Sequence, residues 1–388
     1  MTVLPRIKPG RSDAYADSPT TRLTVPPSPA SLTLPEVIVG SVVLIIAVLA
    51  WMSLLLLDNH VGTFVATCVT AVGALLIILV VALWSKPRPA IRTDPWTLVV
   101  LAVLAVIGGF LFFPGDSYGI TDKDPGGYVE LGASFAHHHS STFSSDLIQH
   151  FPAIARYVDF PGIWRNADGL VYGQFYHLWP ALLAMANHVG GLQLEVQVAP
   201  FVGVLSVCAF ALLLRRAVPG RASLPAAAIG GLLLEVNMME VWQAKYPSTE
   251  IFAQLIFVTM LLALCISLET GWRPAAGASG LLLGIGWLER PDMVVIVALA
   301  AGAGAVLVVL RRFNAQAWWF AGGLVVVLPH ALWQAYAGAA LYSSVNQVPK
   351  LKTLVVGAVA LYAVAFALRA LRPFSRSVVR SLSNRKHI

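Results

Sequence analysis

Charged residues are scarce in this chain of 388 residues: 12% are Asp, Glu, Lys or Arg, whereas 57% are hydrophobic. Because a soluble domain carries about 25% charged residues, this composition excludes an ordinary soluble protein and predicts a polytopic membrane protein. Cysteine is also scarce. Cys68, Cys208 and Cys265 all fall within apolar runs, which excludes a disulfide framework and a CxxC zinc site. The net charge of +7 is interpreted as an excess of basic residues that set the orientation of the chain in the membrane. No nucleic-acid partner is expected.

Long apolar runs dominate the rest of the chain, and most are close to the length of about 20 residues that a membrane helix needs. They lie roughly at residues 37–57, 63–85, 96–113, 197–214, 224–242, 250–268, 275–288, 292–310, 316–335 and 352–368. A shorter run, 178–190, is expected to be a juxtamembrane or re-entrant helix, because a further span would place the basic C-terminal tail outside. The predicted fold class is therefore all-α, with about 10–11 transmembrane helices.

The distribution of Lys and Arg predicts the topology of a multi-pass plasma-membrane protein with both termini in the cytoplasm. A disordered N-terminal tail (1–36) precedes the transmembrane domain (37–368), and a basic tail (369–388) follows it. The first extracytoplasmic loop, 114–196, is large and should contain juxtamembrane helices. The outer face also receives 243–250, 289–292 and 336–351. A site is expected where these polar pieces converge.

The loop contains the stretch "TDKDPGGYVELG" (121–132), in which Asp124 precedes a proline. Asp is a favoured helix N-cap and Pro a favoured first helical residue, so a helix is predicted to begin here. Tyr128, Leu131 and Phe135 form an apolar stripe at helical spacing, which predicts a helix lying along the membrane surface. Asp124 is therefore a helix cap, a functional carboxylate or both.

Four stretches together resemble the GT-C superfamily of integral membrane glycosyltransferases, which includes protein O-mannosyltransferases and aminoarabinose transferases. They are "DPGGY" (124–128), "YGQFYHLWPALLAMANHVGG" (172–191), "KYPSTE" (245–250) and "GLLLGIGWLERPD" (280–292). The resemblance covers roughly residues 96–330. Pro125 stands where the family typically carries the Glu of an Asp-Glu pair, and Asp122 is the alternative second acid.

The resemblance implies transfer of a sugar from a polyprenyl-phosphate donor, with inversion, to a cell-envelope glycan, lipid or protein acceptor. Asp124 is the first candidate for the general base that deprotonates the acceptor hydroxyl, and Asp122 is the second. Lys245 and Arg290 are candidates to stabilise the leaving phosphate. Alternatively, Lys245 anchors a helix at the interface, and Arg290 forms a local ion pair with its acidic neighbours Glu289 and Asp292.

Further substrate contacts are expected from a set of polar and aromatic residues near the predicted span ends: Tyr128, His177, Glu240, Tyr246 and Glu250. Glu250 equally suits the N-terminal dipole of a helix. Aromatic residues of the loop suit sugar stacking or an interfacial belt. No metal ligand is assigned, because the triplet "HHH" (137–139) is predicted to be a solvated helix end; a requirement for Mg²⁺ or Mn²⁺ stays open.

Two alternatives compete with a glycosyltransferase. A lipid or solute transporter would contain charged or broken helices near mid-membrane, for which Glu235 and the glycines of 280–286 are hints. A catalytically inactive or partner-dependent GT-C-like protein would explain the short C-terminus and the missing Asp-Glu pair. An enzyme needs Asp124 beside a groove at the outer face, whereas a carrier needs a central path. The Gly-, Ala-, Val- and Arg-rich composition is typical of a bacterium of high GC content.

Overall fold

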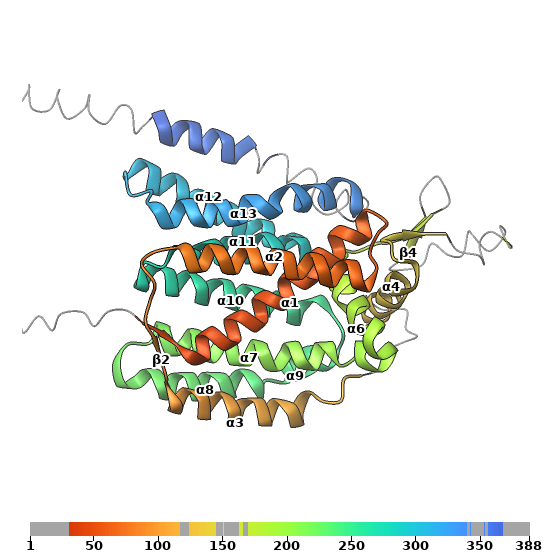
Figure 1. The fold of residues 1–388 in the computed structure, drawn as a ribbon, viewed down its shortest axis with the longest axis horizontal. Helices are drawn as coiled ribbons and strands as arrows, with labels where there is room; N and C mark the ends of the chain where they lie inside the picture. Colours follow the sequence, from red (N-terminus) through yellow and green to blue (C-terminus); the bar gives the residue numbers. More distant parts are fainter. Residues whose placement is uncertain are drawn as a thin grey trace, which may run out of the picture.

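The computed structural model describes residues 31–116, 124–144, 150, 163–165, 170–339, 342, 353 and 356–367. In this part of the chain the protein is an elongated bundle of helices, with small β elements at its ends (Figure 1). Among the described residues, seven helices are long and apolar enough to cross a membrane, or eight if one bent pair forms a single span. The all-α polytopic class predicted from the composition is therefore confirmed, and the described residues contain seven or eight of the 10–11 spans expected.

All ten predicted runs contain helix. Seven correspond to α1 (Leu34–Asp58), α2 (Phe64–Trp84), α3 (Pro95–Phe112), α7 (Val198–Ala217), α10 (Thr249–Thr270), α13 (Ala315–Trp333) and the combination of η3 (Pro291–Met293) with α12 (Val294–Val309). Two further runs give helices shorter than the roughly 20 residues of a full span. They are α11 (Arg273–Glu289) and the helix Val356–Ala367.

The run 224–242 is not one helix. After the short η2 (Gly220–Ala222), it contains α8 (Ser223–Glu235) and α9 (Met238–Lys245), which are bent by 65° at the break between them. The side chain of Asn237 accepts a hydrogen bond from Met239 N at 2.9 Å and so caps the start of α9. Asn is a strong N-cap, because its side chain satisfies a backbone N–H that has no partner within the helix.

The polar loop gathers at one end of the bundle (Figure 1). Its described part contains α4 (Asp124–His138), a three-stranded antiparallel sheet in the order β3-β5-β4, and α6 (Leu178–Glu195). The strands are β3 (Thr142–Phe143), β4 (Ile163–Arg165) and β5 (Val171–Gly173). α6 covers the doubtful run 178–190 and is not among the candidate spans. It is interrupted at Gly191, whose φ of 62° favours glycine.

A helix begins at the loop entrance where it was predicted, and its placement along the membrane surface stays a prediction. α4 begins at Asp124, and its stripe residues Tyr128, Leu131 and Phe135 are buried, at 7%, 0% and 0% exposure. The helix packs on α6, where Gly132 lies against Leu183 and Glu195. An added Cβ at Gly132 would lie 2.8 Å from the Cβ of Leu183, which is closer than real Cβ atoms approach, so the two helices could not pack this closely without glycine.

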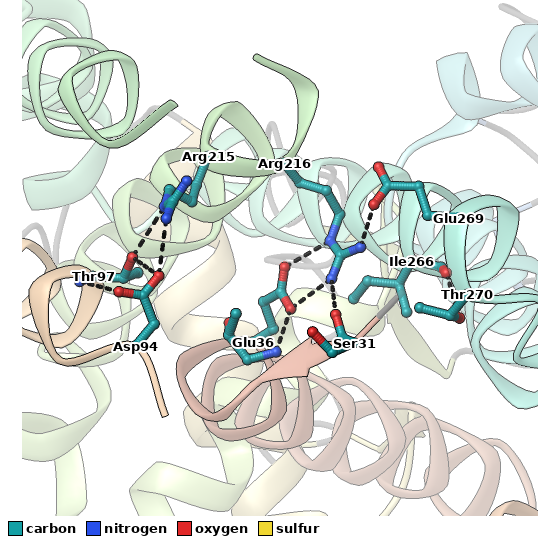
Figure 2. A network of polar contacts seen from close by, with 10 residues as sticks. Ser31, Glu36, Asp94, Thr97, Arg215, Arg216, Ile266, Glu269 and Thr270 are labelled. Carbon is teal, nitrogen blue, oxygen red and sulfur yellow. Dashed lines mark hydrogen bonds and ion pairs between the residues drawn. The ribbon is translucent and has the colours of Figure 1, made fainter. Parts of the chain in front are cut away.

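Near the other end of the bundle, two adjacent arginines of α7 form ion pairs with acidic residues at the starts of α1 and α3 and at the end of α10 (Figure 2). Arg216 binds both carboxylate oxygens of Glu36, at 2.7 and 2.8 Å, and Glu269 at 2.5 Å. Arg215 binds Asp94 at 3.1 Å. We call these five residues the arginine network. Beside it, β1 (Leu32–Thr33) pairs in parallel with β2 (Ile91–Arg92).

Glycines allow α11 and α13 to pack backbone against backbone. A Cβ added at Gly280 would lie 1.9 Å from the carbonyl oxygen of Phe320, and one at Gly323 would lie 2.0 Å from that of Gly277. Small residues are common where membrane helices approach this closely. The glycines of 280–286, considered above as a hint of a transporter, therefore have a packing role at Gly280.

Candidate functional site

Two cavities lie where α4, the connection between α9 and α10, and the end of α11 meet. The larger measures about 400 Å³ and the smaller about 90 Å³. Asp124, Tyr128 and Glu250 line both of them. The larger cavity is completed by Trp242, Gln243, Tyr246 and Ser248. The smaller is completed by Phe175, Tyr176, Thr249, Glu289, Arg290, Pro291 and Tyr342.

Local helix geometry explains how α4 contributes two of the shared residues. Asp124 is the first residue of the helix, where the unpaired backbone N–H groups and the dipole favour a negative charge. Tyr128 lies four residues later and so on the same face. Asp124 is only partly exposed, whereas Tyr128 is 7% exposed and packs on Phe175 with a ring-centroid distance of 5.2 Å.

Arg290 links the end of α11 to the start of α10. Its Nη1 donates to Glu250 Oε1 at 2.6 Å and to Thr249 Oγ1 at 3.2 Å, and its Nε donates to Asp292 at 3.1 Å. The local ion pair considered from the sequence is present with Asp292. The shortest bond, however, goes to Glu250, which is 40 positions away in the chain. Arg290 is thus held at the cavity by two carboxylates from different segments.

The site contains three kinds of polar group, and the surroundings of each group shift its pKa in a way that suits a different role. Burial and then the charge of Glu250 raise the pKa of Asp124, which increases its basicity. Burial and then the charge of Asp124 raise the pKa of Tyr128 well above its usual value, so this hydroxyl stays protonated. Burial alone would lower the pKa of Arg290, but Glu250 and Asp292 outweigh it, raise the pKa and keep the side chain cationic. The cavities therefore combine a proton acceptor, a hydroxyl donor and a fixed cation.

Aromatic rings form much of the remaining lining. Trp242 and Tyr246 stack in the larger cavity, with ring centroids 4.5 Å apart. In the smaller cavity, Tyr342 contacts Phe175 edge-on at 5.7 Å and Tyr176 at 6.3 Å. Such rings present flat, partly apolar surfaces that suit the apolar face of a ring-shaped ligand.

A buried polar cluster holds the end of α13, from which the chain continues to Tyr342. Asp58 Oδ2 accepts hydrogen bonds from His330 Nε2 at 2.9 Å and Gln334 Nε2 at 2.8 Å. Trp51 Nε1 donates to His330 Nδ1 at 3.1 Å, which assigns the ring proton to Nε2. The helix then closes with a π-helical turn, η4 (Gln334–Gly338). This cluster holds the end of α13 and the start of η4 in place, a few residues before Tyr342 in the chain.

The site residues proposed from the sequence fall into three groups. Asp124, Tyr128, Tyr246, Glu250 and Arg290 line the cavities. Asp122 lies outside the described residues. The third group, placed elsewhere in the structure, comprises Lys245, Glu240 and His177.

The three residues of this last group have other surroundings in the described structure. Lys245 ends α9, and its backbone carbonyl accepts a bond from Asp116 N at 3.0 Å. Glu240 is buried at 5% exposure and binds Gln254. His177 is 1% exposed, and its Nε2 lies 3.1 Å from the carbonyl oxygen of Gly173. None of the three is among the described residues that line either cavity.

Several lining residues were not singled out from the sequence, notably Trp242, Gln243, Ser248, Thr249 and Tyr342. Trp242 is the last residue of an apolar run (224–242) that the hydropathy pattern assigns to a single span, and Gln243 is the first residue of the predicted outer-face segment 243–250. Tyr342 lies in a predicted outer-face segment, but its contact with Phe175 joins positions far apart in the chain. The only sequence signal for Tyr342 is that several polar segments are predicted to converge on the outer face of the membrane.

The lining was also tested for metal binding. The described residues contain no group of three or more His, Cys, Asp or Glu side chains that could hold a metal ion. Mg²⁺ commonly binds through one or two carboxylates together with substrate phosphates. Asp124 and Glu250 offer such oxygens, but the described residues do not form a site for a metal alone. A requirement for Mg²⁺ or Mn²⁺, which the sequence left open, therefore stays open, and no set of described residues is assigned as its ligands.

Comparisons with family models, curated proteins and solved structures give no match. The fold, the helix lengths and the hydropathy define a polytopic helical membrane protein. The resemblance to GT-C glycosyltransferases therefore rests on the four sequence stretches alone.

Proposed function

We propose that the protein is a membrane glycosyltransferase that moves a sugar, with inversion, from a polyprenyl-phosphate donor to an extracytoplasmic acceptor. The observation that carries the proposal is the placement of Asp124, the predicted base, in the lining of both cavities with Glu250 and Arg290. These residues come from three of the four stretches that resemble the GT-C superfamily.

The proposed reaction assigns one task to each polar group. Ionised Asp124 takes the proton of the acceptor hydroxyl as that oxygen attacks the anomeric carbon. The phosphate leaves from the opposite face with the bonding electrons, and Arg290 stabilises its growing negative charge. Tyr128 donates a hydrogen bond, and the stacked Trp242 and Tyr246 offer a surface for a sugar ring.

The position of the cavities supports an enzyme over a carrier. Both are lined by α4, by residues of the neighbouring helices and by the segments that connect these helices, and α4 lies with the polar loop at one end of the bundle (Figure 1). A lipid-borne donor can reach such a place from the membrane, and a water-borne acceptor can reach it from the loop side. The structure also supports a transporter as a second candidate through the bent pair α8–α9, a broken helix of the kind that forms transport sites.

Sugar transfer by the full chain in membrane vesicles tests the proposal. Several radiolabelled polyprenyl-phosphate sugars are supplied to wild type, Asp124→Asn and the control Glu130→Gln. Glu130 is another acid of α4, and it is not among the residues that line the cavities. We expect Asp124→Asn to lower transfer by about 10²- to 10⁴-fold, the usual contribution of a general base, and Glu130→Gln to retain it.

Two other results would count against the proposal. Equal transfer by wild type and Asp124→Asn would leave Asp124 as a helix cap. Transfer by neither, across all donors and with normal amounts of protein in the membrane, would contradict the enzyme. Solute flux in the same vesicles would then test the transporter.

A further inference from the structure

The break between α8 and α9 carries two buried acids. Glu235 is the last residue of α8, and Glu240 lies in the first turn of α9. Their exposed fractions are 0% and 5%. At a rise of about 1.5 Å per residue, the 13 residues of α8 place Glu235 about 20 Å from the start of that helix, well within a hydrocarbon layer of about 30 Å.

Among the described residues, no side chain forms a hydrogen bond or ion pair with Glu235, and the backbone amide of Gly108 is the nearby polar group. Neither carboxylate oxygen has a hydrogen-bond partner. Oε1 lies against Gly108 of α3, where an added Cβ would lie only 2.6 Å from it. An unpaired polar group buried in this way requires a ligand, a water molecule or a neutral form to be tolerated.

The neighbouring elements supply no positive charge to Glu235. α3 has no titratable residue between Pro95 and Phe112. The titratable groups of α7 are Cys208, which faces Glu235, and the two arginines at the far end of the helix, which bind the acids of the arginine network. α9 contributes Glu240 and, at its opposite end, Lys245. Among the described residues, therefore, Glu235 faces a thiol and a second acid.

Glu240, in contrast, has a partner. Gln254 Nε2 donates to both of its carboxylate oxygens, at 2.9 and 3.0 Å, and lies 2.9 Å from Ser206 Oγ. Gln254 thus links α10 to α9 and α7. A hydrogen bond from a neutral amide accommodates either an ionised or a protonated carboxyl group. On the same helix, Trp242 and Gln243 line the larger cavity.

We propose that the break between α8 and α9 is a proton-binding site, in which Glu235 holds the proton as a neutral carboxylic acid and Glu240 connects it to the cavity side of α9. An ionised Glu235 would be an uncompensated charge within the membrane, which is strongly disfavoured. Acids buried in membrane helices commonly mark proton pathways. The inference is independent of sugar transfer, because it concerns residues outside the cavity lining.

Labelling with dicyclohexylcarbodiimide, an apolar reagent, tests this site in the full chain in lipid vesicles. The O–H of a carboxylic acid adds across a C=N bond of the carbodiimide, and the O-acylisourea formed rearranges to a stable N-acylurea without a leaving group. Ionised carboxylates react poorly, so the reagent reports the protonated form. The site of modification is found by mass spectrometry of proteolytic peptides.

We expect labelling of Glu235 at pH 7 to exceed that of Glu269, which pairs with Arg216, by at least tenfold. An ordinary glutamate, with a pKa of about 4.3, is protonated in only about one molecule in 500 at that pH. Glu235→Gln should remove this label and leave the thermal unfolding midpoint close to that of wild type, because glutamine mimics the neutral acid in shape and charge.

Three outcomes would overturn the proposal. The first is no labelling of Glu235 in the folded wild-type protein at acidic or neutral pH. The second is labelling that falls when Na⁺ or K⁺ is added at constant pH and ionic strength, which would identify a site for a metal cation. The third is a large loss of stability in Glu235→Gln, which would show that the ionised form is required.

Discussion

Removing Arg216 should destabilise the protein more than removing Arg215, its neighbour in the arginine network. The Arg216 and Glu36 side chains are 7% and 3% exposed, and they form two bonds of 2.7 and 2.8 Å. Arg216→Met would leave the Glu36 charge buried and unpaired, which costs about 3–5 kcal/mol. The bond to Glu269 adds little, because that carboxylate is 48% exposed and solvent screens it.

The matched control is Arg215→Met. The Arg215 side chain is 32% exposed and its partner Asp94 is 17% exposed, so a loss of about 1 kcal/mol or less is expected. A double variant, Arg216→Met with Glu36→Gln, removes the buried charge together with its partner. It should recover most of the loss, because a buried ion pair replaced by neutral groups is often close to neutral in stability.

Unfolding of the purified chain in mixed micelles by denaturant measures these differences in free energy. A smaller loss of unfolding free energy in Arg216→Met than in Arg215→Met would contradict this prediction. A double variant as unstable as Arg216→Met alone would also contradict it, because the loss would then come from packing and not from the unpaired charge of Glu36.

Two further predictions concern the site and the packing of the bundle. Glu250→Gln removes a charge that raises the pKa of Asp124, so the acidic limb of the pH profile of sugar transfer should move to lower pH. Measurement of kcat/KM against pH checks this shift. An acidic limb that does not move would contradict Asp124 as the general base. Gly323→Ala should lower the free energy of unfolding by about 1–3 kcal/mol through overpacking, whereas Gly322→Ala, with no atom within 4 Å of the added Cβ, should change it by less than about 0.5 kcal/mol. Equal effects of the two alanines would contradict the close contact of α11 with α13.

The helices could be predicted from the sequence because each depends on a local signal. An apolar run of about 20 residues is sufficient to specify a membrane helix, and Asp124-Pro125 marks the start of α4. The break in 224–242 was missed, because hydropathy averages over it. Its local signal is Asn237, a strong N-cap residue among apolar neighbours.

The site was harder to predict, because proximity between segments is not encoded locally. Lys245 was a candidate to stabilise the leaving phosphate and Tyr246 a further substrate contact, but successive helical residues point about 100° apart. Trp242 and Tyr246 lie four residues apart and share the face toward the larger cavity, whereas Lys245 does not line it. The contacts of Arg290 with Glu250 and of Tyr342 with Phe175 require the tertiary fold.

The charge of the smaller cavity constrains how a phosphate-bearing donor could bind. Among its described lining residues, Arg290 is the basic one, and Asp124, Glu250 and Glu289 are acidic. An incoming phosphate therefore competes with the carboxylate partners of Arg290. The Asp292 side chain is 66% exposed and joins Arg290 at 3.1 Å, whereas Glu250 binds it at 2.6 Å. Because exposed ion pairs contribute little, we expect the phosphate to displace Asp292 and leave Glu250 to hold the guanidinium. Asp292→Asn should then leave donor binding unchanged or strengthen it, and weaker binding, measured as a raised KM for the donor, would contradict this exchange.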